Sequence, residues 1–161
     1  MSDQLELAAF TLRQVDDELR VDRLCRQLLQ HFHHYLVEDL RLTPLEAGSR
    51  ASGADYFLRD YSIDSRRANI FQIRPQAVKF FAGNWYITHK LEPNLKELQS
   101  ILAGVSSFYH YAAARQLIST RLAEAIEAAC NDLPAYQQRI DEFFALQGDG
   151  YAAWHQGCPE Q

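Results

Sequence analysis

Three side chains on one expected helix face have residue types that bind metal ions. His31 and His34 stand three residues apart in the stretch HFHH, and Glu38 follows four residues after His34. On a helix this spacing places two imidazoles and a carboxylate along one face, which is a ligand set that zinc sites use. A solvated polar face explains the same pattern, and the HExxH arrangement of zinc proteases is lacking. We therefore keep a metal-dependent enzyme as the third of three functional interpretations and expect no bound metal or other cofactor.

Other groups that serve in catalysis are scattered along the chain. Cys25, Cys130 and Cys158 form no CxxC pair, so neither a zinc ribbon nor a disulfide framework is indicated, and a reducing cytoplasm fits best. The sequence contains no GxGxxG, GxxxxGK[ST] or GxSxG motif, which are the patterns of dinucleotide sites, P-loops and serine hydrolases. We therefore predict no catalytic residues and expect a binding module in preference to an enzyme.

The basic residues gather in the middle third of the chain. Residues 41–91 carry eight basic and four acidic side chains, whereas residues 1–40 and 92–161 are both acidic. Five of these cations are interleaved with aromatic residues and form our candidate macromolecule-binding set: Arg59, Arg66, Arg67, Arg74 and Lys79. Such a mixture can follow a phosphate backbone while aromatic rings stack. Solvation of a loop, with arginines paired to Asp60 and Asp64, is the alternative explanation.

One helix is expected to organise the rest of the chain, from Pro93 to Ile118. Its apolar residues form two adjacent stripes at helical spacing: Leu95, Leu98, Leu102, Val105, Tyr109 and Ala112 in one, and Ile101, Val105, Phe108 and Tyr111 in the other. A helix with so wide an apolar surface is covered from two sides. Gly104 in its middle predicts a neighbouring helix that crosses closely at that point.

Further helices are expected before and after this one. Their expected ranges are 14–40, 52–64, 75–91, 119–131 and 134–148, with a loop at 42–53 around Pro44, Gly48, Ser49 and Gly53. Residues 3–13 fit either a strand or a helix. The sequence thus predicts an all-α protein, a mixed or orthogonal bundle of about six helices around the central helix near residues 93–116. A single domain should span residues 1–148, followed by a tail, 149–161, in which only Trp154 indicates docking.

Three segments in order carry a family resemblance: YFLRDYSID, RPQAVKFFAGNWYI and ELQSILAGVSSFYHYAAARQLIS. Over about residues 24–130 this pattern of apolar positions and turns resembles the N-terminal core-binding (SAM-like) domain of tyrosine recombinases. The resemblance implies a small helical domain that clamps duplex DNA. The arginine, histidine and tyrosine constellation that cleaves DNA is lacking, so recombination by this chain is not expected.

These observations lead to an ordered set of functional interpretations. The first is a non-catalytic helical module that binds a protein partner or a second copy of itself, and the second is a DNA-binding domain that uses the basic set. The net charge of −5 favours the first over the second. No stretch approaches 18 uninterrupted apolar residues and no secretion signal opens the sequence, so no membrane association is expected.

Overall fold

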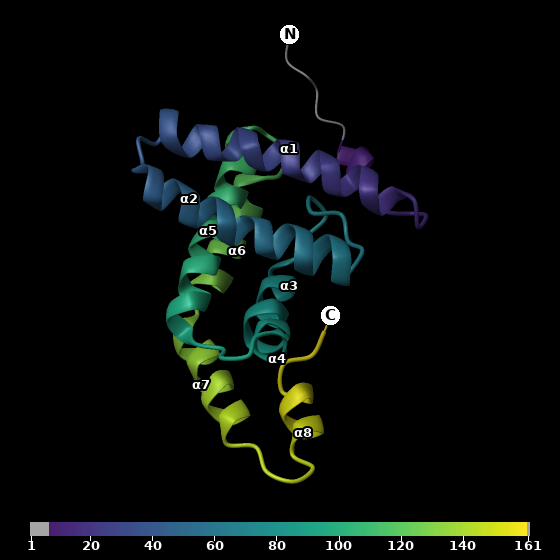
Figure 1. Cartoon of the computed structure of the whole chain (residues 1–161), viewed down its shortest axis with the longest axis vertical. Coiled ribbons are helices and arrows are strands. Elements are labelled where there is room, and N and C mark those ends of the chain that lie inside the picture. The colour runs from purple at the N-terminus through teal and green to yellow at the C-terminus, as the bar shows by residue number, and fades with distance from the viewer. Residues whose placement is uncertain (1–6, 161) are drawn as a thin grey trace.

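The computed structural model describes residues 7–160, and all of their regular secondary structure is helical. Its α-helices are α1 (Asp17–Glu38), α2 (Pro44–Asp55), α3 (Pro75–Phe80), α4 (Tyr86–His89), α5 (Leu95–Ala114), α6 (Thr120–Cys130), α7 (Leu133–Phe144) and α8 (Tyr151–Gln156). Figure 1 shows α1 and α2 lying side by side and crossing α5, with α6 running alongside α5 and α8 at the other end of the molecule. The predicted all-α mixed bundle is confirmed. No described helix is both long enough and apolar enough to cross a membrane.

The central helix is confirmed as α5. Both predicted stripes are inside the protein, and Leu102, Phe108 and Tyr109 are almost completely buried. Asn94 caps the helix by accepting a hydrogen bond from the Glu97 backbone N–H at 2.8 Å. The helix packs against α2 on one side and α6 on another, so it is covered from two sides as its wide apolar surface requires.

The close crossing predicted at Gly104 is also confirmed, and its partner is α2. A Cβ atom added to Gly104 would clash with the Arg50 carbonyl oxygen and lie 2.9 Å from the Ala54 backbone nitrogen. On the other helix, a Cβ atom on Gly53 would lie 2.8 Å from the Cα atom of Ile101. The two glycines therefore let the backbones of α2 and α5 come into direct contact.

The loop predicted at residues 42–53 is wrong, because this segment forms most of α2. Thr43 caps the helix by accepting a hydrogen bond from the Glu46 backbone N–H at 3.2 Å, and Pro44 occupies the first turn. Ser52, at which the next helix was expected to begin, lies inside α2. The small residues that resembled a loop are needed for close packing, since Gly53 and Ala54 are buried against α5. Small residues that favour a turn in an isolated segment are here required for close packing of two helices.

Two segments of π-helix adjoin the α-helices. The first, η2 (Tyr56–Ser65), extends α2, and the second, η3 (Phe81–Trp85), joins α3 to α4. Aromatic rings from the two segments fill the space between them: Phe57 meets Phe81 edge to face with ring centroids 5.0 Å apart. Such edge-to-face pairs add to the stability gained from burial alone. On its other side η2 lies against α1, where Arg59 pairs with Asp22.

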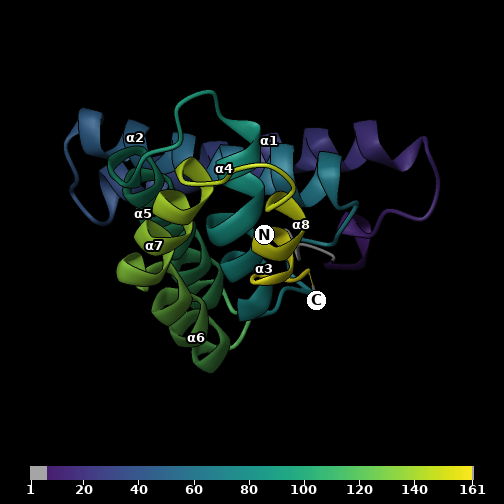
Figure 2. The same cartoon turned by 90° about the horizontal axis from the view of Figure 1, so that it is seen from below.

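The chain ends pack onto this framework. A short 3-10 helix, η1 (Leu7–Phe10), forms part of the segment 3–13 whose structure was left open, and residues 3–6 lie outside the described residues. The tail after residue 148 contains α8, and Trp154 is buried, which confirms the prediction that it docks. Trp154 donates a hydrogen bond to the Arg139 carbonyl at 3.0 Å, and the Arg139 guanidinium lies over its ring. Figure 2 shows α8 beside α3.

Candidate functional site

Three of the five predicted basic residues form ion pairs within the chain. Arg59 Nε lies 2.8 Å from Asp22 Oδ1, and Arg59 Nη1 lies 3.1 Å from Asp55 Oδ1. The hydrogen bond to Asp22, more than any other contact, raises the pKa of Arg59. Arg67 pairs with Glu18 at 3.1 Å, and Arg66 pairs with Glu160. Their first role is thus to connect elements of the fold.

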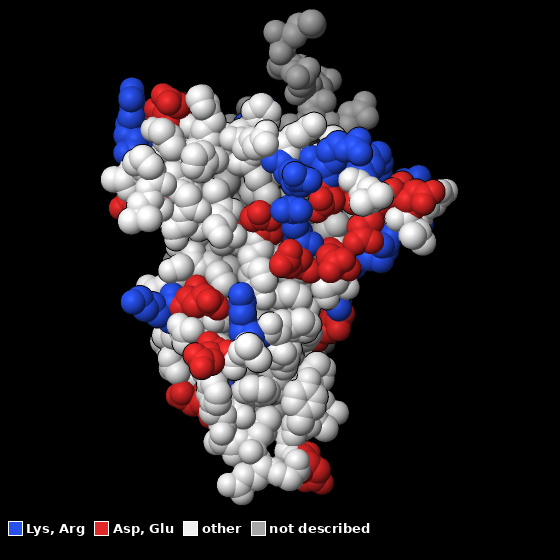
Figure 3. Space-filling model, in the orientation of Figure 1, with Lys and Arg blue, Asp and Glu red and all other residues white. Residues whose placement is uncertain are grey.

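The five cations also do not share one surface. Arg59 borders the space between α1 and η2, Arg66 and Arg74 line a pocket beside α3, and Lys79 faces the C-terminal end of α6. Figure 3 shows Lys and Arg atoms interspersed with Asp and Glu atoms over α1 and η2, where charge is dense. Arg74 and Lys79 are exposed and have no ion pair with any residue between 7 and 160. The structure does not gather the basic set into one surface.

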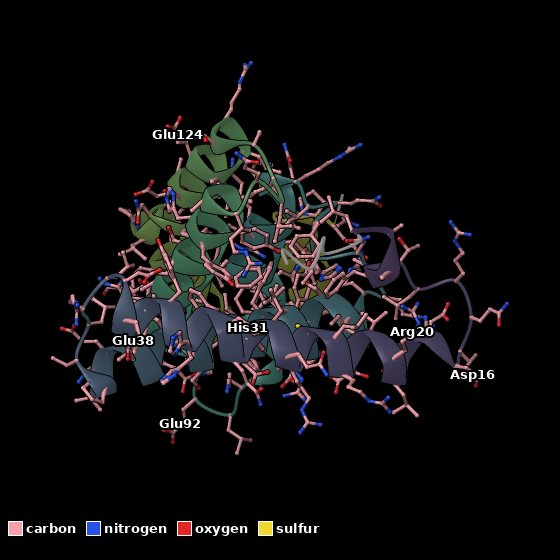
Figure 4. The ribbon with its side chains drawn as sticks, turned by 90° about the horizontal axis from the view of Figure 1, so that it is seen from above. Asp16, Arg20, His31, Glu38, Glu92 and Glu124 are labelled. Atoms are coloured by element: carbon pink, nitrogen blue, oxygen red, sulfur yellow. The ribbon has the colours of Figure 1, made fainter. Side chains whose placement is uncertain are left out.

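The three candidate metal ligands do not converge on a common position. His31, His34 and Glu38 are all exposed, and Figure 4 shows His31 and Glu38 well separated along α1. Within residues 7–160, no three His, Cys, Asp or Glu side chains lie close enough together to hold a metal ion. On a single helix, residues seven positions apart are separated by about 10 Å along the axis, so another element would have to bring in further ligands.

The cysteines carry no sign of an activated nucleophile. Cys25 and Cys130 are buried, and burial raises the pKa of each thiol to about 12. A thiol is nucleophilic only as the thiolate, so both remain unreactive near neutral pH. Burial also raises the pKa of the half-buried Cys158 thiol. His110 does contact a carboxylate, Glu127, at 2.9 Å, but this pair lies at the surface between α5 and α6.

A groove between the start of α1 and η2 is the surface feature that the sequence analysis missed. It encloses about 500 Å³ and is lined by Val15, Asp16, Glu18, Leu19, Asp22, Arg59, Asp60, Ile63 and Asp64. Val15 and Leu19 stand one helical turn apart and are 82% and 76% exposed. Ile63 is buried below them. Large apolar side chains so exposed, beside a groove, are typical of a contact surface.

The rim of this groove is strongly acidic. Five of its nine lining residues are carboxylates, and Arg59 is the one cation among them. Arg59 is already paired with Asp22, while Asp60 and Asp64 form no ion pair with any residue of the described range 7–160. Burial, followed by the charge of Asp55, raises the pKa of Asp60. A cation bound beside Asp60 would stabilise its charged carboxylate against both burial and the negative charge of Asp55. The groove therefore favours a positively charged ligand.

The start of α1 explains how the groove is held. Asp17 Oδ2 accepts hydrogen bonds from the backbone N–H groups of Arg13 and Gln14, both at 2.8 Å, and these bonds fix the turn that leads into α1. Val15 is thereby held outward, one turn before Leu19. The acidic residues Asp16, Asp17 and Glu18 suit the positive end of the α1 dipole, and this explanation gives no reason for the apolar residues beside them. The missed signal was that two apolar residues outside the buried stripe, Val15 and Leu19, flank this acidic run on either side.

Comparisons of this chain with models of known families, with curated proteins and with solved structures find no match.

Proposed function

We propose that this protein is a non-catalytic interaction module that binds a protein partner in the groove between α1 and η2. The observation that supports the proposal is the pair of exposed side chains, Val15 and Leu19, above a groove rimmed by carboxylates. Burial of a leucine side chain in an interface stabilises a complex by about 1.5 to 3 kcal/mol. Two such side chains one turn apart supply a small apolar anchor, and the acidic rim supplies orientation.

The chemistry of the groove selects a basic, amphipathic segment as its ligand. A helix with leucine-like residues three or four positions apart can place its apolar face against Val15 and Leu19, and lysine or arginine at its edges can meet Asp60 and Asp64. A second copy of this chain fits less well. A symmetric dimer through the groove would place the same acidic rim against itself, which is unfavourable.

DNA binding by the basic set stays a prediction, and the charges argue against it as the leading function. Arg59, Arg66 and Arg67 are already paired with carboxylates of the same chain. Each would have to exchange a carboxylate for a phosphate, which removes most of the gain from counterion release. Arg59 also lies beside the acidic rim, which repels a duplex.

Selection from a random peptide library displayed on phage tests the proposal. The wild-type chain is the target, and a Val15→Ala, Leu19→Ala double variant serves for counter-selection. Because both side chains are exposed, the double variant should fold normally. We expect the recovered peptides to combine Lys or Arg with apolar residues three or four positions apart. Recovery of acidic peptides, or of peptides that bind the double variant equally well, would contradict the proposal.

A matched variant and a second probe complete the experiment. Leu45 and Leu91 are as exposed as Val15 and Leu19 but lie outside the groove. A Leu45→Ala, Leu91→Ala double variant should therefore keep full affinity for the recovered peptides. Fluorescence anisotropy with a labelled random DNA duplex tests the DNA-binding alternative. Submicromolar binding of duplex at physiological salt, weakened by a combined Arg66→Gln, Arg67→Gln change, would favour the DNA-binding alternative.

A further inference from the structure

A second hollow lies on a different side of the molecule, between η2, the segment that follows it and the start of α3. It encloses about 260 Å³, which suits a ligand of a few to a dozen heavy atoms. Its polar wall includes Arg66, Arg74, Tyr61 and Ser62, and its apolar wall includes Ile73 and Phe80. It shares no lining residue with the groove between α1 and η2.

A carboxylate of the chain itself occupies the cationic side of this pocket. Glu160 is one of the lining residues and forms an ion pair with Arg66. Arg74 also lines the pocket, and no carboxylate among residues 7–160 pairs with it. The Glu160 carboxylate therefore neutralises one of the two guanidinium groups and leaves the other for a further anion.

Two hydroxyl groups add hydrogen-bonding capacity that the described chain does not use. Tyr61 and Ser62 are 3% and 5% exposed, and the side-chain hydroxyl of neither has a hydrogen-bond partner between residues 7 and 160. Burial raises the pKa of Tyr61 to about 12, so its hydroxyl keeps its proton and remains a donor. Among residues 7–160 the one buried side-chain nitrogen or oxygen without a partner is Arg139 Nη2, so these two hydroxyls are accessible from the pocket and can bind a ligand there.

Buried contacts hold the tail that carries Glu160. Asn84 is almost completely buried and donates from Nδ2 to the carbonyl oxygens of His155 at 3.2 Å and Cys158 at 3.1 Å. Cys158 Sγ in turn donates to the Lys79 carbonyl at 3.4 Å. Figures 1 and 2 both show the tail passing beside α3 on its way from α8. The approach of Glu160 to the pocket is thus set by the fold.

We propose that this pocket binds a small organic anion, a carboxylate or phosphate ester with an apolar substituent, and that Glu160 is its internal competitor. The anionic group would take the place of the Glu160 carboxylate on Arg66, recruit Arg74, and accept hydrogen bonds from Tyr61 and Ser62. The substituent would lie against Ile73 and Phe80. A purely structural ion pair explains Arg66 and Glu160, but it leaves Arg74 and both hydroxyls without a role.

Titrations followed by two-dimensional NMR of the backbone amides test this proposal. The probes are phenyl phosphate, benzoate and inorganic phosphate, with benzyl alcohol as the neutral control. The proteins are wild type, Glu160→Gln, Glu160→Gln combined with Arg66→Gln, and Glu142→Gln as a matched surface control. Because Glu160→Gln removes the competing carboxylate, we expect it to bind phenyl phosphate or benzoate about threefold or more tightly than wild type does. Loss of Arg66 should then weaken binding about tenfold.

The arms of the titration separate the possible results. The largest amide shifts should fall at Ser62, Ile73 and Arg74, and Glu142→Gln should behave as wild type. A preference for phenyl phosphate or for benzoate assigns the anionic group, and weaker binding of inorganic phosphate shows that the apolar wall contributes. Absence of binding to Glu160→Gln at millimolar probe, equal binding of benzyl alcohol, or affinity that is independent of Arg66 would overturn the proposal.

Discussion

The crossing of α2 and α5 can be tested by adding one methyl group at either of two glycines. Gly104→Ala would place a Cβ atom against the Arg50 carbonyl oxygen and 2.9 Å from the Ala54 nitrogen. Both of these are backbone atoms, so relief of the clash requires that α2 move away from α5. Gly48→Ala is the matched change, because it lies inside α2 and a Cβ atom there meets nothing within 4 Å.

The two substitutions should have opposite effects on stability. Alanine is better than glycine in a helix by about 1 kcal/mol, and this gain applies to both positions. Overpacking of a close contact costs about 1 to 3 kcal/mol or more, and this loss applies only at Gly104. Because the atoms in the way at Gly104 are backbone atoms, the upper part of this range, about 2 to 3 kcal/mol, applies there. We expect Gly48→Ala to raise the free energy of unfolding by about 0.5 to 1 kcal/mol, and Gly104→Ala to lower it by about 1 to 2 kcal/mol.

Urea unfolding followed by far-ultraviolet circular dichroism measures both changes. With a slope of about 1 to 3 kcal/mol per molar urea, the midpoints of the two variants should differ by roughly 1 M. Stabilisation by both substitutions would show that the helices do not touch at Gly104 and would refute the packing argument.

Other predictions follow from burial. Truncation of Leu102 or Phe108 to Ala should lower the free energy of unfolding by about 2 to 5 kcal/mol, measured by the same urea assay; losses below about 1 kcal/mol at both would contradict the central role of α5. A thiol reagent at about pH 8 should modify Cys158 first, and Cys25 and Cys130 only after unfolding, as mass spectrometry of the labelled peptides would show. Stability should fall as the pH rises above about 9, because the native thiols of Cys25 and Cys130 keep protons, with pKa values of about 12, that the unfolded chain loses near its ordinary value of 9.0. Urea midpoints that do not change between pH 8 and about 10.5 would contradict this expectation.

The features that depend on local spacing were predictable. The apolar stripes of α5 and the positions of the two helices that follow it depend on short stretches of sequence, and the structure contains α5, α6 and α7 close to the expected positions. Gly104 even indicated the close crossing. The identity of the crossing helix was missed, because Gly48, Ser49 and Gly53 have the composition of a loop, and the contact that explains Gly53 is with α5, about fifty residues away in sequence.

The candidate sites depended on pairings across the chain, which sequence spacing does not give. Arg59 reaches Asp22 on another helix, Arg67 reaches Glu18, and Arg66 reaches Glu160 near the other end of the chain. A basic segment in sequence therefore became a set of separate ion pairs in space. The groove was missed for the same reason: Leu19 and Asp64 are distant in sequence, and only the packing of η2 beside α1 brings them to one surface.

The most direct test of the proposed function is a binding measurement that removes charge from the groove rim and nothing else. An Asp60→Asn, Asp64→Asn double variant changes two rim carboxylates, and a Glu124→Gln, Glu142→Gln double variant removes the same charge from exposed positions outside the groove. Figure 4 shows Glu124 far from Asp16, which lies at the groove end of α1. With a peptide recovered by selection, anisotropy at low salt should show about three- to tenfold weaker binding for the rim variant and no change for the control. Equal affinities of the two variants would contradict the proposal that the acidic groove is the binding site.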